Sequence, residues 1–146
     1  MKSIRGMLGM RVVMDAKKLG HVAQVRISRD ITRMEGVWLD AGLAGARYIP
    51  SEHISMLGSV AVIVDAVGKR LPVCQKSLLR RVVSTGGCRL GIAVDAWVDE
   101  QTFAVEAITL SKSFWDDILH GRETIAHFHV DDGNNIVADE ESEVDV

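Results

Sequence analysis

The sequence predicts an all-β protein made of two small β-barrels in tandem. A repeated phrase is the first observation: Leu19-Gly20 opens one apolar stretch, and Leu90-Gly91 opens another seventy-one positions later. Each phrase follows a Val-Val pair and a polar turn, and each leads into a second apolar stretch with one acid, Glu35 or Glu106. Many short apolar stretches separated by turn residues are typical of small barrels. We therefore expect about six strands in each unit.

The first unit is predicted over residues 1–67. Ala23, Val25 and Ile27 alternate with polar residues, which is the period of a half-buried strand. The other stretches are bounded by turn signals such as Ser28-Arg29-Asp30 and Gly58-Ser59, and Ile49-Pro50 resembles a strand end that runs into a turn. The expected strands are 10–14, 19–27, 34–40, 54–57 and 60–64.

A linker is predicted over residues 68–77, and the second unit over 78–138. Ser113 as a cap, an acid at Asp116 and a stop at Gly121 predict a short helix in this unit. The dipeptide Asp132-Gly133 predicts a closing hairpin. The acidic tail 139–146 lacks apolar periodicity, so we expect it to be disordered. The expected strands are 81–84, 90–98, 103–110, 125–130 and 135–138.

The composition is that of a folded protein, with 146 residues and 47% hydrophobic content. Gly6, Gly9 and Arg11 interrupt the N-terminal region, so we expect neither a signal peptide nor a transmembrane helix to begin there. We therefore expect a cytoplasmic protein without membrane insertion. The two cysteines, Cys74 and Cys88, match neither a disulfide framework nor a thiolate zinc site. Unpaired thiols are the expectation, and the predicted turn at Cys88 leaves open an exposed, modifiable thiol.

Charge is distributed unevenly along the chain. Residues 1–94 hold 15 Lys and Arg against 6 Asp and Glu, whereas residues 95–146 hold 2 against 14. Such asymmetry fits an anionic partner for one half, and it fits attraction between the halves or between copies equally well.

Three motifs of the first unit occur together: the Leu-Gly strand, the Ile49-Pro50 to Ile54 element and the stretch Leu57–Val64. With these motifs the chain resembles the PRC-barrel family, named after the photosynthetic reaction centre H subunit. The resemblance covers residues 5–66 well and 78–139 more loosely. It implies barrels of about six strands, an adaptor role and no catalytic residues. The stand-alone type fits better than the membrane-anchored type or the ribosome maturation factor, whose additional N-terminal elements are not seen here.

One cluster could hold a transition metal: His127, His129 and Asp131 share a face if they lie on one strand. The competing interpretation is a solvated strand face that runs into a turn. Asp131–Asn135 lacks the ligand spacing of a calcium loop, and Asp116-Asp117 is explained by a helix N-terminus. Because nucleotide-binding and nucleophile motifs do not occur, we expect neither an enzyme nor a cofactor.

Basic residues gather around the first hairpin and the linker. They form a candidate patch for an anionic partner and are Lys17, Lys18, Arg26, Arg29, Arg33, Lys69 and Arg70. Charged turns that keep a small barrel soluble explain them too. The favoured hypothesis is an adaptor that binds protein partners, including a homo-oligomer. The alternatives are an RNA- or ribosome-associated factor using the patch, and a metal- or redox-responsive module using His127, His129 or Cys88. Trp38, Trp97 and Trp115 are expected in packing, or as interface anchors if exposed.

Overall fold

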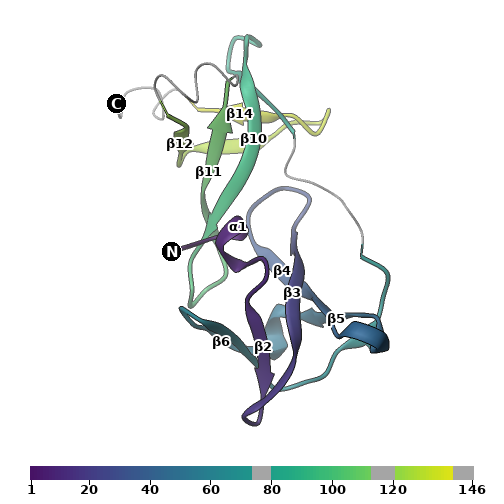
Figure 1. The fold of residues 1–146 in the computed structure, drawn as a ribbon. Coiled ribbons are helices and arrows are strands. Elements are labelled where there is room, and N and C mark those ends of the chain that lie inside the picture. Colours follow the sequence, from purple (N-terminus) through teal and green to yellow (C-terminus); the bar gives the residue numbers. More distant parts are fainter. Residues whose placement is uncertain (74–79, 113–120, 140–146) are drawn as a thin grey trace.

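The computed structural model describes residues 1–73, 80–112 and 121–139. The chain is mostly β and forms two curled half-barrel sheets, drawn one above the other in Figure 1. This confirms the predicted all-β class. The helix predicted over 113–121 and the tail predicted over 139–146 lie outside the described residues, apart from Gly121 and Asp139.

The first sheet has the strand order β6-β7-β2-β3-β4-β5-β8. Short 3-10 turns η1 (Gly42–Ala44) and η2 (Ser51–His53) flank β5. Residues 69–70, which the sequence assigned to the linker, add the edge strand β8 to this sheet. The bounds are β2 Arg11–Met14, β3 Lys17–Ile27, β4 Met34–Asp40, β5 Ala46–Pro50, β6 Ile54–Leu57, β7 Ala61–Val64 and β8 Lys69–Arg70.

The second sheet repeats this arrangement with the order β13-β14-β9-β10-β11-β12. In both sheets the first strand of the unit pairs in parallel with its last one, β2 with β7 and β9 with β14, while the other neighbours within the repeat are antiparallel. The two units therefore share one topology. The bounds are β9 Arg81–Ser84, β10 Arg89–Val98, β11 Val105–Ser111, β12 Glu123–Ile125, β13 Phe128–Val130 and β14 Ile136–Ala138.

The repeated Leu-Gly phrase marks a β-bulge. Leu19 is the extra residue where β3 pairs with β2, and Leu90 is the extra residue where β10 pairs with β9. A side chain on Gly20 would collide with the carbonyl oxygen of Asp40, and one on Gly91 with that of Ser111. Glycine is required at both positions because the end of the next strand passes so close.

Both acids that follow the phrase also sit at bulges. Glu35 on β4 and Glu106 on β11 are the extra residues in the pairing with β3 and β10, respectively. Bulges at matching positions bend both sheets in the same way.

The two units meet through matching hairpin loops. The Met34 N–H donates to the Phe103 carbonyl (2.8 Å), and the Val105 N–H donates to the Thr32 carbonyl (2.9 Å). Between these bonds Arg33 and Ala104 form an antiparallel bridge. Because each partner occupies the same place in its own unit, the contact has the reciprocal form of a two-fold interface.

The N-terminal segment breaks this symmetry. Strand β1 (Lys2–Ser3) pairs with β10 of the second sheet, and helix α1 (Ile4–Met7) follows between the two units in Figure 1. Ile4 and Met7 are buried in a core cluster that draws residues from both sheets. The buried carboxylate of Asp95 accepts the Arg5 N–H at 3.2 Å. The first seven residues thereby join the two units.

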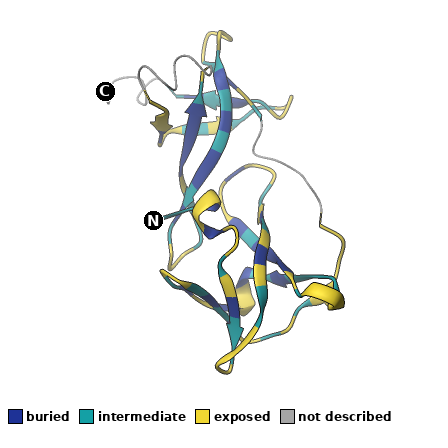
Figure 2. Cartoon of the chain, in the orientation of Figure 1, coloured by how far each residue is buried: buried dark blue, intermediate teal, exposed yellow. Residues whose placement is uncertain are grey.

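Most predicted strands are confirmed, including 34–40, 54–57 and 81–84 at their bounds. The prediction of one strand over 125–130 is wrong: β12 pairs with β11, whereas β13 pairs with β14. The predicted closing hairpin is β13 with β14. In Figure 2 the buried positions lie along the strands of both sheets, β10 and β11 among them, and most turns are exposed. Within the described residues, no helix is long and apolar enough to cross a membrane.

Candidate functional site

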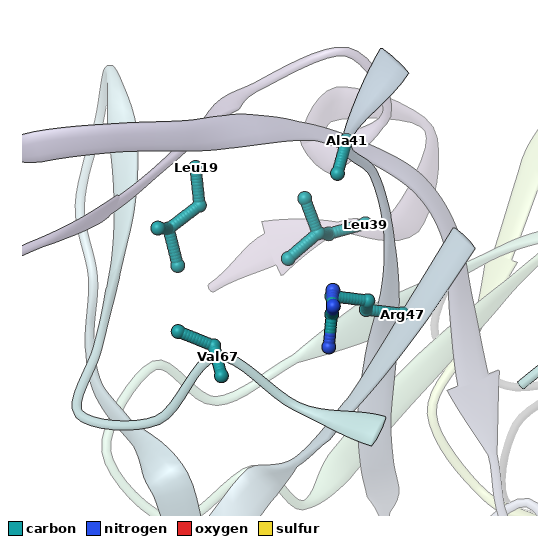
Figure 3. A pocket seen from close by; sticks show the side chains of 5 residues that line it. All are labelled: Leu19, Leu39, Ala41, Arg47 and Val67. Carbon is teal, nitrogen blue, oxygen red and sulfur yellow. The ribbon is translucent and has the colours of Figure 1, made fainter. Parts of the chain in front are cut away.

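An open pocket of about 190 Å³ lies at one end of the first sheet. Side chains from four separate segments converge on it in Figure 3. Four are aliphatic and one is cationic, so the pocket suits an apolar group that enters beside a positive charge. The lining residues are Leu19, Leu39, Ala41, Arg47 and Val67.

The sheet geometry sets this lining. Leu39 on β4 and Arg47 on β5 are directly opposite each other, so their side chains lie on the same face. That face is the inner one, because Leu39 is fully buried in the core. Leu19 reaches the pocket from the bulge at the start of β3, and Val67 from the turn between β7 and β8.

Two arginines are paired in register at this end. Arg47 is directly opposite Arg70 of the edge strand β8, so two cations share one face of the sheet. The Arg47 Nη1 donates to the Gly68 carbonyl (3.3 Å), and the Arg70 Nη2 donates to the Ala44 carbonyl (3.2 Å). Neither arginine forms an ion pair with an acid of the described residues. Like charges directly opposite on a sheet destabilise it, so the pair is an electrostatic cost in the absence of an anion.

Three aliphatic residues in or next to the segments that line the pocket are exposed. Val67 lines the pocket and is still 46% exposed. Leu43, in the η1 turn that follows Ala41, is fully exposed, and Leu71, which follows Arg70, is 39% exposed. Asp40 is the one acid between Leu39 and Arg47, and its carboxylate accepts the Gly42 N–H at 2.9 Å. Exposed aliphatic side chains gathered beside a pocket mark a surface suited to an interaction.

The second sheet carries an ion pair at the corresponding position. Glu123 is directly opposite Leu110, as Arg47 is opposite Leu39. Lys112 follows β11 where Ala41 follows β4, and its Nζ lies 2.9 Å from the Glu123 Oε1. An ion pair in the second sheet therefore stands where the first sheet has an alanine and an arginine without an acid.

The predicted basic patch is divided by the structure. Lys17 and Lys18 begin β3, whereas Arg26 lies near its other end, roughly 25 Å away at about 3.3 Å per residue. Arg29 and Arg33 lie in the loop beyond that end, and Lys69 and Arg70 form β8. The seven residues thus fall into three groups.

Arg80 lies beside the loop that carries Arg29 and Arg33, and we call these three arginines the loop group. The Arg80 Nη1 donates to the Arg29 carbonyl at 2.6 Å. Burial lowers the pKa of Arg80, and the neighbouring charge of Arg29 lowers it further. Arg80 was not among the predicted patch residues, because only the fold brings it to this loop.

Arg26 is occupied by its own sheet. Its guanidinium lies 5.5 Å from the centre of the Tyr48 ring and 3.4 Å from a Glu35 oxygen. Tyr48 also contacts the Trp38 ring, with centroids 4.9 Å apart. Burial raises the pKa of the Tyr48 phenol, although the charge of Arg26 opposes that rise. The Tyr48 ring is therefore already in contact with Arg26 and Trp38. Trp38 is buried, and Trp97 donates through its Nε1 to Thr109 at 3.0 Å, so both are packing residues as expected.

The structure does not bring the three predicted metal ligands, His127, His129 and Asp131, together into one site. His129 Nδ1 lies 2.9 Å from Asp139 Oδ1, whereas Asp131 accepts the N–H groups of Gly133 and Asn135 at 2.9 Å within the hairpin turn. His127 precedes β13. No group of three potential metal ligands occurs within residues 1–73, 80–112 and 121–139.

A second histidine–carboxylate pair was not predicted from the sequence. His53 Nδ1 lies 2.8 Å from Asp65 Oδ1. The two pairs are related, because Asp65 and Asp139 each follow the last strand of a unit, and their N–H groups donate to the carbonyls of His53 and His127. Each pair links the two strands of a closing hairpin, His53–Asp65 at its open end and His129–Asp139 from the middle of β13.

Cys88 is an exposed free thiol in the turn between β9 and β10, and its N–H donates to Ser84 Oγ at 3.1 Å. The predictions that concern Cys74, Trp115 and Asp116-Asp117 lie outside the described residues.

No protein-family model matches this chain, and no curated protein matches its sequence. The pocket, the two arginines and the ion pair that stands in the second sheet at the positions of Ala41 and Arg47 are therefore the basis for a functional proposal.

Proposed function

We propose that this chain is a non-enzymatic adaptor of the tandem PRC-barrel type, whose first sheet docks a segment of a partner protein at the pocket end. One observation carries the proposal: an open pocket with exposed aliphatic neighbours in the first sheet, at a position that an ion pair occupies in the second. Two units with one topology and different end surfaces fit a protein in which one unit binds and the other supports it.

The test is affinity capture with the full tagged chain, followed by quantitative mass spectrometry. Val67→Asp places a charge in the pocket lining, and Val60→Asp places the same charge on the β6–β7 turn, where Val60 is 69% exposed. We expect a stoichiometric protein that is recovered by the wild type and by Val60→Asp and is lost with Val67→Asp. Recovery of that protein by both variants contradicts docking at the pocket, and the absence of any stoichiometric partner contradicts the adaptor role.

A second candidate function is RNA binding by the loop group. It is favoured by the gathering of Arg29, Arg33 and Arg80 at one loop, where Arg80 contacts the Arg29 backbone. If these arginines contact RNA phosphates, the affinity for RNA should weaken steeply as the salt concentration rises. The measurement is fluorescence polarisation of a labelled RNA at low and high salt. Arg29→Gln with Arg33→Gln should abolish binding, whereas Lys17→Gln with Lys18→Gln, at the other end of β3, should not. Equal loss in both double variants contradicts a local site.

A further inference from the structure

We infer that the pocket end of the first sheet recognises an extended acidic segment of a partner protein: a carboxylate binds between Arg47 and Arg70, and a neighbouring apolar side chain fills the pocket. This inference rests on the proposed adaptor function and names the chemistry of the partner.

The size of the pocket points to a side chain as its occupant. Sites for cofactors and drug-sized ligands enclose roughly 300–1,000 Å³, whereas this pocket measures about 190 Å³. Its apolar lining comes from Leu19, Leu39, Ala41 and Val67, so the occupant is aliphatic or aromatic. A group this small gains affinity when it is anchored on a longer segment, and the exposed Leu43 and Leu71 offer further apolar contact to such a segment.

The charge of the site selects an acid next to that side chain. Arg47 and Arg70 are directly opposite each other in the pairing of β5 with β8, and their guanidinium groups donate to the backbone carbonyls of Gly68 and Ala44. A carboxylate between them removes the repulsion of the two cations and offers two oxygens to guanidinium groups, whose planar geometry matches a carboxylate. Strand β8 is also the edge of its sheet, so an extended segment can lie along it.

The second sheet provides an internal comparison. There the position of Arg47 is held by Glu123, which pairs with Lys112 at 2.9 Å. An acidic segment is repelled by Glu123, and Lys112 is already engaged with that carboxylate. The two substitutions Ala41→Lys and Arg47→Glu therefore transfer to the first sheet an ion pair that this topology already accommodates.

The experiment is selection of a displayed random peptide library on the immobilised full chain, followed by fluorescence polarisation of the enriched peptides. We expect enriched sequences with Asp or Glu within two positions of an aliphatic or aromatic residue. Their affinity should fall about tenfold or more in Arg70→Gln, which is the loss of one charge-assisted hydrogen bond. It should be abolished in the Ala41→Lys, Arg47→Glu variant and unchanged in Glu123→Gln. Thermal unfolding verifies that each variant is folded.

The inference is overturned if no peptide is enriched, if the enriched peptides lack acids, or if Arg70→Gln binds them as the wild type does. These outcomes are distinct from failure of the adaptor role. A partner captured by the wild type, lost with Val67→Asp and retained by the Ala41→Lys, Arg47→Glu variant sustains the adaptor and contradicts the acidic segment.

Discussion

Arg47 and Glu123 occupy the same place in the two sheets, each directly opposite the leucine that precedes the last residue of the neighbouring strand. The two leucines, Leu39 and Leu110, are both buried in the core. The units therefore preserve the apolar face that holds the fold and reverse the charge beside it. In the second sheet the reversal creates an ion pair with Lys112, and in the first it leaves two arginines opposed. This difference in charge is the observation on which the proposed docking site of the first sheet rests.

Substitution of either repeated glycine should destabilise the protein. Gly20→Ala and Gly91→Ala each place a methyl group against a backbone carbonyl of the next strand, which cannot move without disturbing the bulge. We expect each variant to lose about 1–3 kcal/mol of unfolding free energy in urea denaturation. Gly86→Ala is the matched control, since its nearest neighbour would be Ser84 Oγ at 3.8 Å. Equal stability of Gly20→Ala and Gly86→Ala would contradict the close approach.

Removal of the Asp95 carboxylate should release the N-terminal segment. Its Oδ1 accepts the N–H groups of Arg5 (3.2 Å) and Ala96 (2.8 Å), and Asp95 is buried. Asp95→Ala leaves both donors without this acceptor and should cost about 1–3 kcal/mol. Hydrogen exchange at residues 2–7 should accelerate beyond what global destabilisation explains. Asp95→Asn retains an oxygen acceptor and should lose less. Unchanged exchange in Asp95→Ala would show that β1 and α1 are held by other contacts.

Stability should decline in acid through two loop carboxylates. Hydrogen bonds from the Thr32 and Ser28 side chains lower the pKa of Asp30, and backbone N–H groups of Thr102 and Gln101 lower the pKa of Asp99. A lowered pKa means that the ionised form stabilises the fold. This contribution is present above the ordinary value of 3.8 and is lost as the pH falls through the lower, folded-state value.

Urea denaturation at a series of pH values from neutral to strongly acidic measures this effect. Asp99→Ala should be less stable than the wild type at neutral pH, and the difference should shrink toward acid. Asp132→Ala, in the β13–β14 turn, removes an exposed acid as a control. A wild-type advantage over Asp99→Ala that grows in acid would reverse the predicted sign.

Local patterns predicted most of the strands and the closing hairpin, but they made no prediction of the long-range strand pairing. Alternation and turn residues located β3, β4, β6 and β9, because each of these signals acts within a few residues. The parallel pairing of β2 with β7 and the docking of α1 against the second sheet depend on contacts across many residues. The break between β12 and β13 also depends on such long-range contacts. At this point the chain stops pairing with β11 and begins to pair with β14.

The pocket could not be found from the sequence for the same reason. Its lining comes from four segments, and Arg47 was absent from the predicted basic patch. Gly20 and Gly91 are seventy-one positions apart in the sequence, but Arg47 and Glu123 are separated by a different number of residues. The reason is that the connection from β4 to β5 is shorter than the connection from β11 to β12. Strand register supplies that correspondence, and only the fold supplies strand register.

Charge reversal at Arg70 should stabilise the protein while removing its proposed ligand. Arg70→Glu places an acid directly opposite Arg47, so a repulsive cross-strand pair becomes attractive. Arg70 is exposed, so little packing is lost, and the hydrogen bonds that it donates to the Ala44 carbonyl lie at the surface. We expect a gain of about 0.2–1 kcal/mol in unfolding free energy, and the gain should fade at high salt. Binding of acidic peptides should be lost in the same variant.

Lys69→Glu is the matched control, because it makes the same change of charge at the next residue of β8. Lys69 is opposite Tyr48 and projects to the other face of the sheet, away from Arg47. It should therefore gain less stability than Arg70→Glu at low salt. If the two variants are equally stable at every salt concentration, Arg47 and Arg70 do not repel each other measurably. If Arg70→Glu alone is more stable, the natural arginine is retained at a cost to the fold, as expected of a residue kept for binding.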